Sequence, residues 1–152
     1  MTDPAAFDRD VRLTIAECIR DRGLVPSLSE VAARVSAPES EVAPSFARLA
    51  AARTMILRPG TTEILSFNPF AAGPTAFRIR VNGRDWSALC AWDAFGVVAA
   101  LDADGLVLGH CADVCGVPLE VRLEGDAIGA LDGVVMQFAL PAREWWKDIV
   151  FT

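Results

Sequence analysis

The segment Trp86-Ser-Ala-Leu-Cys90-Ala-Trp-Asp93-Ala-Phe-Gly-Val-Val-Ala-Ala-Leu101 decides the fold. Its first residues read as the end of a strand, and its alanine-rich remainder reads as a buried helix. A strand that runs directly into a helix predicts a mixed α and β unit. Cys90 and Asp93 stand three residues apart, so on the first turn of this helix the thiol and the carboxylate lie on the same side.

This spacing brings together two groups that can carry chemistry. A thiol at a helix N-terminus gains thiolate character from the helix dipole and the free N–H groups. A carboxyl beside it, in apolar surroundings provided by Trp86, Trp92 and Phe95, is expected to have a raised pKa. Cys90 and Asp93 therefore form a candidate pair of nucleophile and acid. The alternative interpretation is a buried cysteine and an aspartate that caps the helix.

The residues upstream of this segment predict helices and a hairpin. Apolar residues at helical spacing indicate a helix over 7–21. Ser27 and Glu30 form the capping-box pattern of a second helix. A third helix, with Ser36 as its expected cap, runs to about Arg53. Two short strands, 55–57 and 63–65, flank a Pro-Gly turn.

Three helices and a two-stranded wing predict a winged-helix-like unit over residues 1–67. Such a unit serves either packing and dimerisation or DNA binding. The third helix contains Glu39, Glu41 and only Arg48 as a basic residue. This charge pattern disfavours contact with nucleic acid.

The residues downstream predict a second unit over 68–152. Residues 68–74 read as a linker, and 76–81 alternate as a half-buried strand before the hairpin turn Asn82-Gly83. Residues 126–130 are expected to form one short helical turn. Further strands are expected at 106–109, 119–123, 133–140 and 149–151. The chain is therefore predicted to be α+β, with a mixed, mostly antiparallel second unit around a buried helix.

Composition limits the classes of function. The chain has 152 residues, with 14 basic and 20 acidic side chains and a net charge of −6, which argues against a general binder of nucleic acid or anionic membranes. No apolar run approaches bilayer length, and no signal peptide is visible. A cytoplasmic location is therefore expected. In that reducing compartment the four cysteines are thiols or ligands rather than disulfides.

A second cysteine-containing stretch reads Gly109-His110-Cys111-Ala-Asp-Val-Cys115-Gly116. Two thiols and the only histidine suggest half of a metal site. A closed zinc site needs four ligands, and no second pair follows downstream. A structural turn with buried cysteines is the competing interpretation. Cys18 falls on the apolar face of the first helix and is expected to lie in the core.

These motifs together resemble a known family, the alkylmercury lyases (organomercurial lyases). The resemblance rests on Cys90-Ala-Trp-Asp93-Ala, the following alanine-rich helix, His110-Cys111, and the run Gly-x-Pro-Leu-x-Val over 116–121. It extends upstream to the winged-helix-like start and to Asn68-Pro-Phe70, and it covers nearly the whole chain. The order of the Cys-Ala-x-Asp element and His-Cys is its most specific part.

The resemblance implies a concrete activity. Members of the family cleave the carbon–mercury bond of organomercurials by protonolysis, releasing a hydrocarbon and Hg(II), and need no other cofactor. Cys90 matches the cysteine that binds mercury as a thiolate, and Asp93 matches the aspartate of proton transfer. Cys111 matches a cysteine regarded as structural. The expected partner is an organomercurial or another small soft electrophile, with no membrane partner.

The sequence departs from the family at the second catalytic cysteine. That cysteine belongs to a C-terminal strand and is expected at or just after Thr152, so this chain is either truncated or a shortened homologue with altered function. Within the chain, Cys115 is the better substitute as a second mercury ligand beside Cys90, and Cys111 is the other. Two alternatives stay open: a soft-metal sensor using Cys90, Cys111 and Cys115, or a winged-helix regulator.

Overall fold

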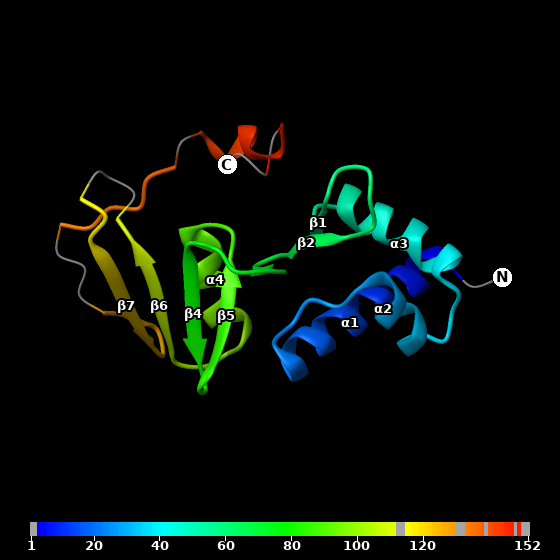
Figure 1. The fold of residues 1–152 in the computed structure, drawn as a ribbon, viewed down its shortest axis with the longest axis horizontal. Coiled ribbons are helices and arrows are strands. Elements are labelled where there is room, and N and C mark those ends of the chain that lie inside the picture. Colours follow the sequence, from blue (N-terminus) through cyan, green and yellow to red (C-terminus); the bar gives the residue numbers. More distant parts are fainter. Residues whose placement is uncertain (1–2, 112–114, 130–132, 139, 148, 150–152) are drawn as a thin grey trace.

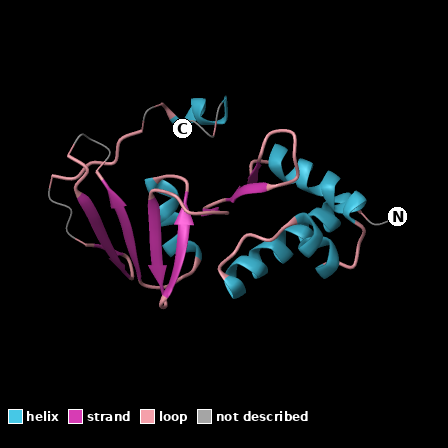
Figure 2. Cartoon of the chain, viewed as in Figure 1, coloured by secondary structure: helices cyan, strands magenta, loops and turns pink. Residues whose placement is uncertain are grey.

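The computed structural model describes residues 3–111, 115–129, 133–138, 140–147 and 149. In these residues the helices gather in the N-terminal part and most strands follow (Figures 1 and 2). The α-helices are α1 (Pro4–Arg22), α2 (Leu28–Arg34), α3 (Glu39–Ala51) and α4 (Ala91–Ala100). The fold is α+β, as predicted.

Local sequence rules account for the ends of the first helices. Asp3 accepts a hydrogen bond from the Ala5 N–H at 3.1 Å, and α1 ends at Gly23, whose φ of 75° is left-handed. Ser27 and Glu30 form the predicted capping box at the start of α2. The predicted cap of α3 was wrong, because Pro38 is the N-cap and Ser36 lies outside the helix with φ 54°.

The N-terminal helices pack on a small sheet. Strands β1 (Met55–Leu57), β2 (Ile64–Phe67) and β3 (Phe70–Ala71) pair antiparallel in that order. The predicted hairpin over 55–65 is therefore confirmed. Residues 68–74 are more than the predicted linker, because they contain β3, and the ring of Phe70 lies 5.6 Å from that of Trp86.

A second, larger sheet lies beyond β3 and is antiparallel throughout its described strands. Its order is β5-β4-β6-β7-β8. The strands are β4 (Phe77–Val81), β5 (Arg84–Ala88), β6 (Gly105–His110), β7 (Pro118–Glu124) and β8 (Ala127–Ile128). Asn82 and Gly83 turn the β4–β5 hairpin with φ of 50° and 74°, the backbone that the Asn-Gly pair predicted.

Three predictions for the C-terminal part need correction or remain open. Residues 126–130 were expected to be helical, but β8 pairs with β7 there through a turn at Gly125, φ 56°. Residues 134–138 are described and form no strand, and a 3-10 helix, η1 (Ala142–Lys147), follows. Alternating apolar residues had predicted that strand, yet β8 already occupies the edge of the sheet in the described chain. The strand predicted over 149–151 lies outside the described residues, apart from Ile149.

Helix α4 covers one face of the larger sheet and shares its core. Val97 and Val98 of α4 are buried in one cluster with Ile79 and Val107 of the sheet. A Cβ added to Gly105 of β6 would stand 2.7 Å from the Val98 side chain, so only glycine allows this close approach. This close contact between helix and sheet holds α4 against the sheet.

The helical part is tied to this sheet by one arginine of β5. The Arg84 guanidinium donates hydrogen bonds of 3.0 Å to the carbonyl oxygens of Arg20 and Asp21 at the end of α1, and stacks over the Trp86 ring at 5.7 Å. None of the helices in the described residues is both long and apolar enough to cross a bilayer.

Candidate active site

The first turn of α4 carries the two residues that the sequence singled out. β5 ends at Ala88, whose carbonyl oxygen accepts a 2.6 Å hydrogen bond from the Thr75 hydroxyl. Cys90 is the N-cap of α4, with φ −141° and ψ 173°, and Asp93 stands in the first turn. The strand end and the buried helix face therefore fix the backbone on both sides of Cys90.

The two side chains meet, as their spacing predicted. A side-chain hydrogen bond between Cys90 and Asp93 lowers the pKa of Asp93, but burial has the larger effect and raises it above the usual aspartate value. The predicted raised pKa of Asp93 is thus confirmed. Its surroundings differ from the prediction in one respect: Trp86 is buried, Phe95 is half-buried, and Trp92 is 62% exposed.

The predicted thiolate character of Cys90 is not what the structure supports. Burial raises the pKa of the half-buried Cys90 thiol, and the negative charge of Asp93 raises it further. The backbone N–H groups of Asp93 and Trp92 lower this pKa, as the position at a helix start predicted, but less than burial raises it. Desolvation therefore outweighs the helix N-terminus, and the unliganded pair favours a neutral thiol.

The other three cysteines differ in their exposure to solvent. Cys18 is fully buried in α1, as expected for a core residue. Cys111 follows β6 and is half-buried, whereas Cys115 is exposed, and neither forms a disulfide in the described chain. The N–H of Cys111 donates a 2.8 Å hydrogen bond to the Val117 carbonyl oxygen. His110 is exposed at the end of β6.

Within the described residues, no three or more side chains of His, Cys, Asp and Glu gather as a metal site. Cys115 therefore does not join Cys90 and Asp93 in one cluster of that kind. The three thiols of the sensor alternative do not assemble into one either. The role of Cys115 as a second mercury ligand beside Cys90 stays a prediction.

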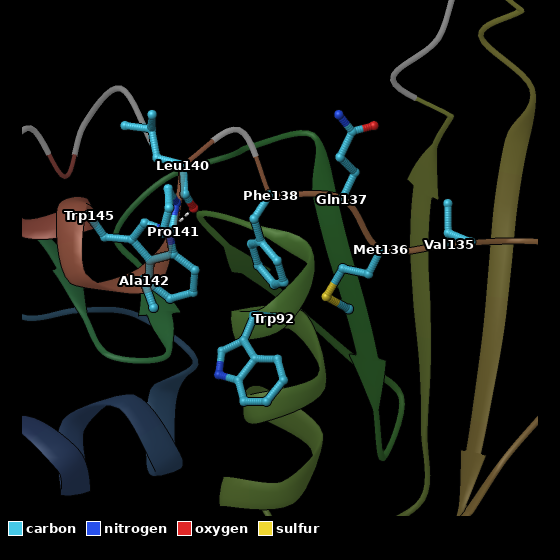
Figure 3. Close-up of a pocket in the computed structure, with 9 residues that line it drawn as sticks. All are labelled: Trp92, Val135, Met136, Gln137, Phe138, Leu140, Pro141, Ala142 and Trp145. Atoms are coloured by element: carbon cyan, nitrogen blue, oxygen red, sulfur yellow. Dashed lines mark hydrogen bonds between the residues drawn. The ribbon is translucent and has the colours of Figure 1, made fainter.

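An apolar groove next to the first turn of α4 was missed by sequence reasoning. It has a volume of about 860 Å³ and extends from Trp92 of α4 to residues 135–138 and 140–142 and Trp145. Figure 3 shows Trp92 on α4 facing Phe138 and Met136. Ring centroids lie 6.5 Å apart for Trp92 and Phe138, and 5.1 Å apart for Phe138 and Trp145.

The groove has a fixed aromatic wall. The Trp145 indole N–H donates a 2.8 Å hydrogen bond to the Leu140 carbonyl oxygen, which orients the ring. The only signal for this wall in the sequence was the run of apolar and aromatic residues over 134–146. Its alternating apolar residues predicted a strand instead. Because Trp92 lies between Cys90 and Asp93 in the sequence, this wall begins within the same helical turn as the two candidate catalytic residues.

Comparison with known proteins matches this part of the chain to a family. The model of the MerB alkylmercury lyase family matches residues 70–152, which include Cys90, Asp93, Cys111 and Cys115. The chain belongs to the alkylmercury lyase family. No curated protein matches it.

A solved structure supports the fold of this alkylmercury lyase family member. It is described as the mercury-bound form of MerB2, with a TM-score of 0.59 and 24% sequence identity. The match covers 81% of this chain and 65% of the other, so the present chain spans about two thirds of the MerB2 chain. At this identity the likeness shows a shared fold and no more.

Proposed function

We propose that this chain cleaves carbon–mercury bonds by protonolysis, with Cys90 binding mercury and Asp93 delivering the proton to carbon. One observation carries the proposal: Cys90 and Asp93 share a hydrogen bond at the start of α4, and burial raises the pKa of both. A carboxylate whose pKa is raised accepts the proton of a neighbouring thiol more readily than an ordinary aspartate and can then pass it to a carbon leaving group. Membership in the alkylmercury lyase family supports the same assignment.

The reaction balances with these two groups. An organomercury cation, R–Hg⁺, displaces the Cys90 proton, which passes to the Asp93 carboxylate as the sulfur–mercury bond forms. The Asp93 carboxyl then protonates carbon, the carbon–mercury bond breaks, and R–H leaves. Hg(II) remains on the Cys90 thiolate, and Asp93 is again a carboxylate. Mercury is a soft ion that prefers thiolate ligands, so its binding overcomes the raised pKa of Cys90.

Each group has a different effect on the transition state. The Cys90 thiolate donates electron density to mercury and makes the attached carbon more basic. Asp93 supplies the proton within reach of that carbon, because its side chain already contacts the sulfur. General acid catalysis of this kind contributes about 10²- to 10⁴-fold to a rate. A second sulfur ligand would increase the electron density on mercury further. We propose Cys115 or an added small thiol as this second ligand.

The test is turnover of phenylmercury under excess small thiol, with benzene release measured by gas chromatography. Asp93→Asn is expected to lower turnover by about 10²-fold or more while mercury binding persists. Cys90→Ser is expected to abolish both turnover and binding at this site. Asp102→Asn is the matched control, since Asp102 is an exposed aspartate just beyond α4. Unchanged benzene release by Cys90→Ser would overturn the proposal.

A thiol-based soft-metal binding protein without lyase activity is the second candidate. The exposed Cys115 near the half-buried Cys111 favours it. The two functions differ in their need for Asp93, which protonolysis requires and metal binding does not. Mercury binding by the wild type with no benzene release would favour this second candidate.

The third alternative, a winged-helix regulator, has less support. Arg48, the basic residue of α3, donates two 2.7 Å hydrogen bonds to Asp8 of α1. Its charge is therefore paired with that of Asp8 at the protein surface, while Glu39 and Glu41 at the start of α3 are also exposed. An acidic helix surface repels phosphate groups, so DNA binding is not proposed.

A further inference from the structure

Two thiols flank the connection between β6 and β7, Cys111 at its start and Cys115 near its end. The strands pair up to His110 and Pro118, and the Cys111 N–H donates to the Val117 carbonyl oxygen at 2.8 Å just beyond that pair. Both ends of the connection are thus anchored. Cys111 stands at one end, half-buried, and Cys115 near the other, exposed.

The two sulfur atoms interact directly. The Cys115 sulfur shares a side-chain hydrogen bond with Cys111 and faces the backbone N–H groups of Val117 and of Cys115 itself. These contacts lower the pKa of Cys115, in contrast to that of Cys90. The exposed member of the pair, Cys115, lies open to an ion from solution.

We infer that Cys111 and Cys115 form a dithiol site that binds one soft metal ion in two-coordinate fashion, as Hg(II) does, and that this site does not depend on Cys90 or Asp93. The inference goes beyond the proposed lyase activity, since it concerns inorganic ions rather than organomercurials. It pairs Cys115 with Cys111, which leaves the added small thiol as the second sulfur ligand beside Cys90.

The chemistry of the donors defines the class of ion. Two thiolates suit a soft ion that accepts two ligands, whereas a closed zinc site needs four. The described residues supply no cluster of three His, Cys, Asp or Glu side chains there. Binding is balanced as Hg²⁺ plus two thiols giving a mercury dithiolate and two protons.

The test uses the full chain carrying Cys90→Ser, titrated with inorganic Hg(II) against a competing monothiol. Native mass spectrometry counts bound mercury, and the ultraviolet charge-transfer absorption of mercury thiolates follows the titration. The Cys90→Ser chain is expected to bind one Hg(II). Adding Cys115→Ser is expected to weaken that binding by roughly 10²-fold or more, because a second tethered ligand raises avidity by about that factor.

Two further variants keep the result interpretable. Cys115→Ala repeats the test with a smaller side chain, and circular dichroism checks the fold of each variant; Cys115 is exposed, so both are expected to fold. His110→Ala in the Cys90→Ser chain is the matched control and is expected to keep full affinity. Binding that survives both Cys115 substitutions, or that disappears with Cys90→Ser alone, would overturn the inference. Benzene release by the Asp93→Asn variant judges the lyase proposal separately.

Discussion

Helices α2 and α4 begin with the same arrangement, an N-cap residue followed three positions later by an acid, yet the two acids behave oppositely. At α2, the Ser27 N–H donates to a Glu30 carboxylate oxygen at 2.7 Å, and the Glu30 N–H donates to the Ser27 hydroxyl at 3.3 Å. These bonds, with Arg22 nearby, lower the pKa of Glu30 to about 2. At α4, burial raises the pKa of Asp93.

The comparison separates the effect of a helix N-terminus on the pKa of an acid from the effect of burial. Both ends present free N–H groups and the same dipole direction. Glu30 is exposed and hydrogen-bonded, so its charged form is favoured, whereas the half-buried Asp93 is desolvated. Among the described contacts, Cys90 makes no capping hydrogen bond of the kind Ser27 makes. The first pair stabilises a helix, and the second retains protons for chemistry.

The largest expected effect on stability tests whether packing against the sheet, rather than an N-cap hydrogen bond, holds α4 in place. Val97→Ala removes a fully buried side chain on the face of α4 toward the sheet and is expected to cost about 2 kcal/mol of unfolding free energy. Ala100→Ser, at an exposed position of the same helix, is the control and is expected to change it by less than about 0.5 kcal/mol. Urea unfolding measures both. Equal effects would show that packing does not anchor the site.

The next largest effect is expected when the N-cap of α2 receives the residue type found at the N-cap of α4. Ser27→Cys replaces a strong hydrogen-bond acceptor with a weak one and is expected to cost about 1 kcal/mol. Ser40→Cys, at an exposed position of α3 outside any N-cap, serves as its control. Urea unfolding again provides the measurement. No loss of stability in Ser27→Cys would mean that the capping box contributes little and that the comparison with α4 has no energetic basis.

The reverse exchange at α4 is expected to have a smaller effect of opposite sign. Cys90→Ser places a preferred N-cap residue on extended backbone and is expected to raise the free energy of unfolding by about 0.5 kcal/mol. The same substitution is proposed to abolish mercury binding there. Stability and chemistry would then compete at one position. A destabilised Cys90→Ser variant would contradict this account of the cap.

The smallest expected effect is a pair of pH dependences with opposite signs. The folded pKa of Glu30 is depressed, so its contribution to stability is present above the unfolded value, about 4.3, and is lost as the pH falls toward about 2. The folded pKa of Asp93 is raised, so its contribution is present below about 3.9 and is lost as the pH rises through its folded value.

At pH 7, Glu30→Gln is therefore expected to destabilise the protein and Asp93→Asn to stabilise it, each by less than about 0.5 kcal/mol. At the acid end of the titration both differences are expected to shrink, because both carboxyls become protonated in folded and unfolded chains alike. Urea unfolding at a series of pH values tests the signs. If both variants shift stability in the same direction at pH 7, the contrast between the two helix starts does not hold.

Features governed by neighbours in sequence could be predicted from the sequence. Helix spacing and caps predicted α1 and α2, the Asn82-Gly83 pair predicted the β4–β5 turn, and the three-residue spacing predicted that Cys90 and Asp93 would meet. Each of these depends on backbone geometry within one or two turns of chain. The resemblance to the alkylmercury lyases was likewise readable from motif order, and the family match confirms it.

Other features depend on side chains that are distant in the sequence and surround a group in the fold. The raised pKa of Cys90 follows from burial, which outweighs the local N–H groups. The aromatic groove joins α4 to residues 135–145, segments that only the fold brings together. By itself, then, the sequence determined the helices, the turns and the pairing of Cys90 with Asp93. The tertiary structure decided which thiol is desolvated and which is exposed, because solvent access is set by contacts between segments far apart in the chain.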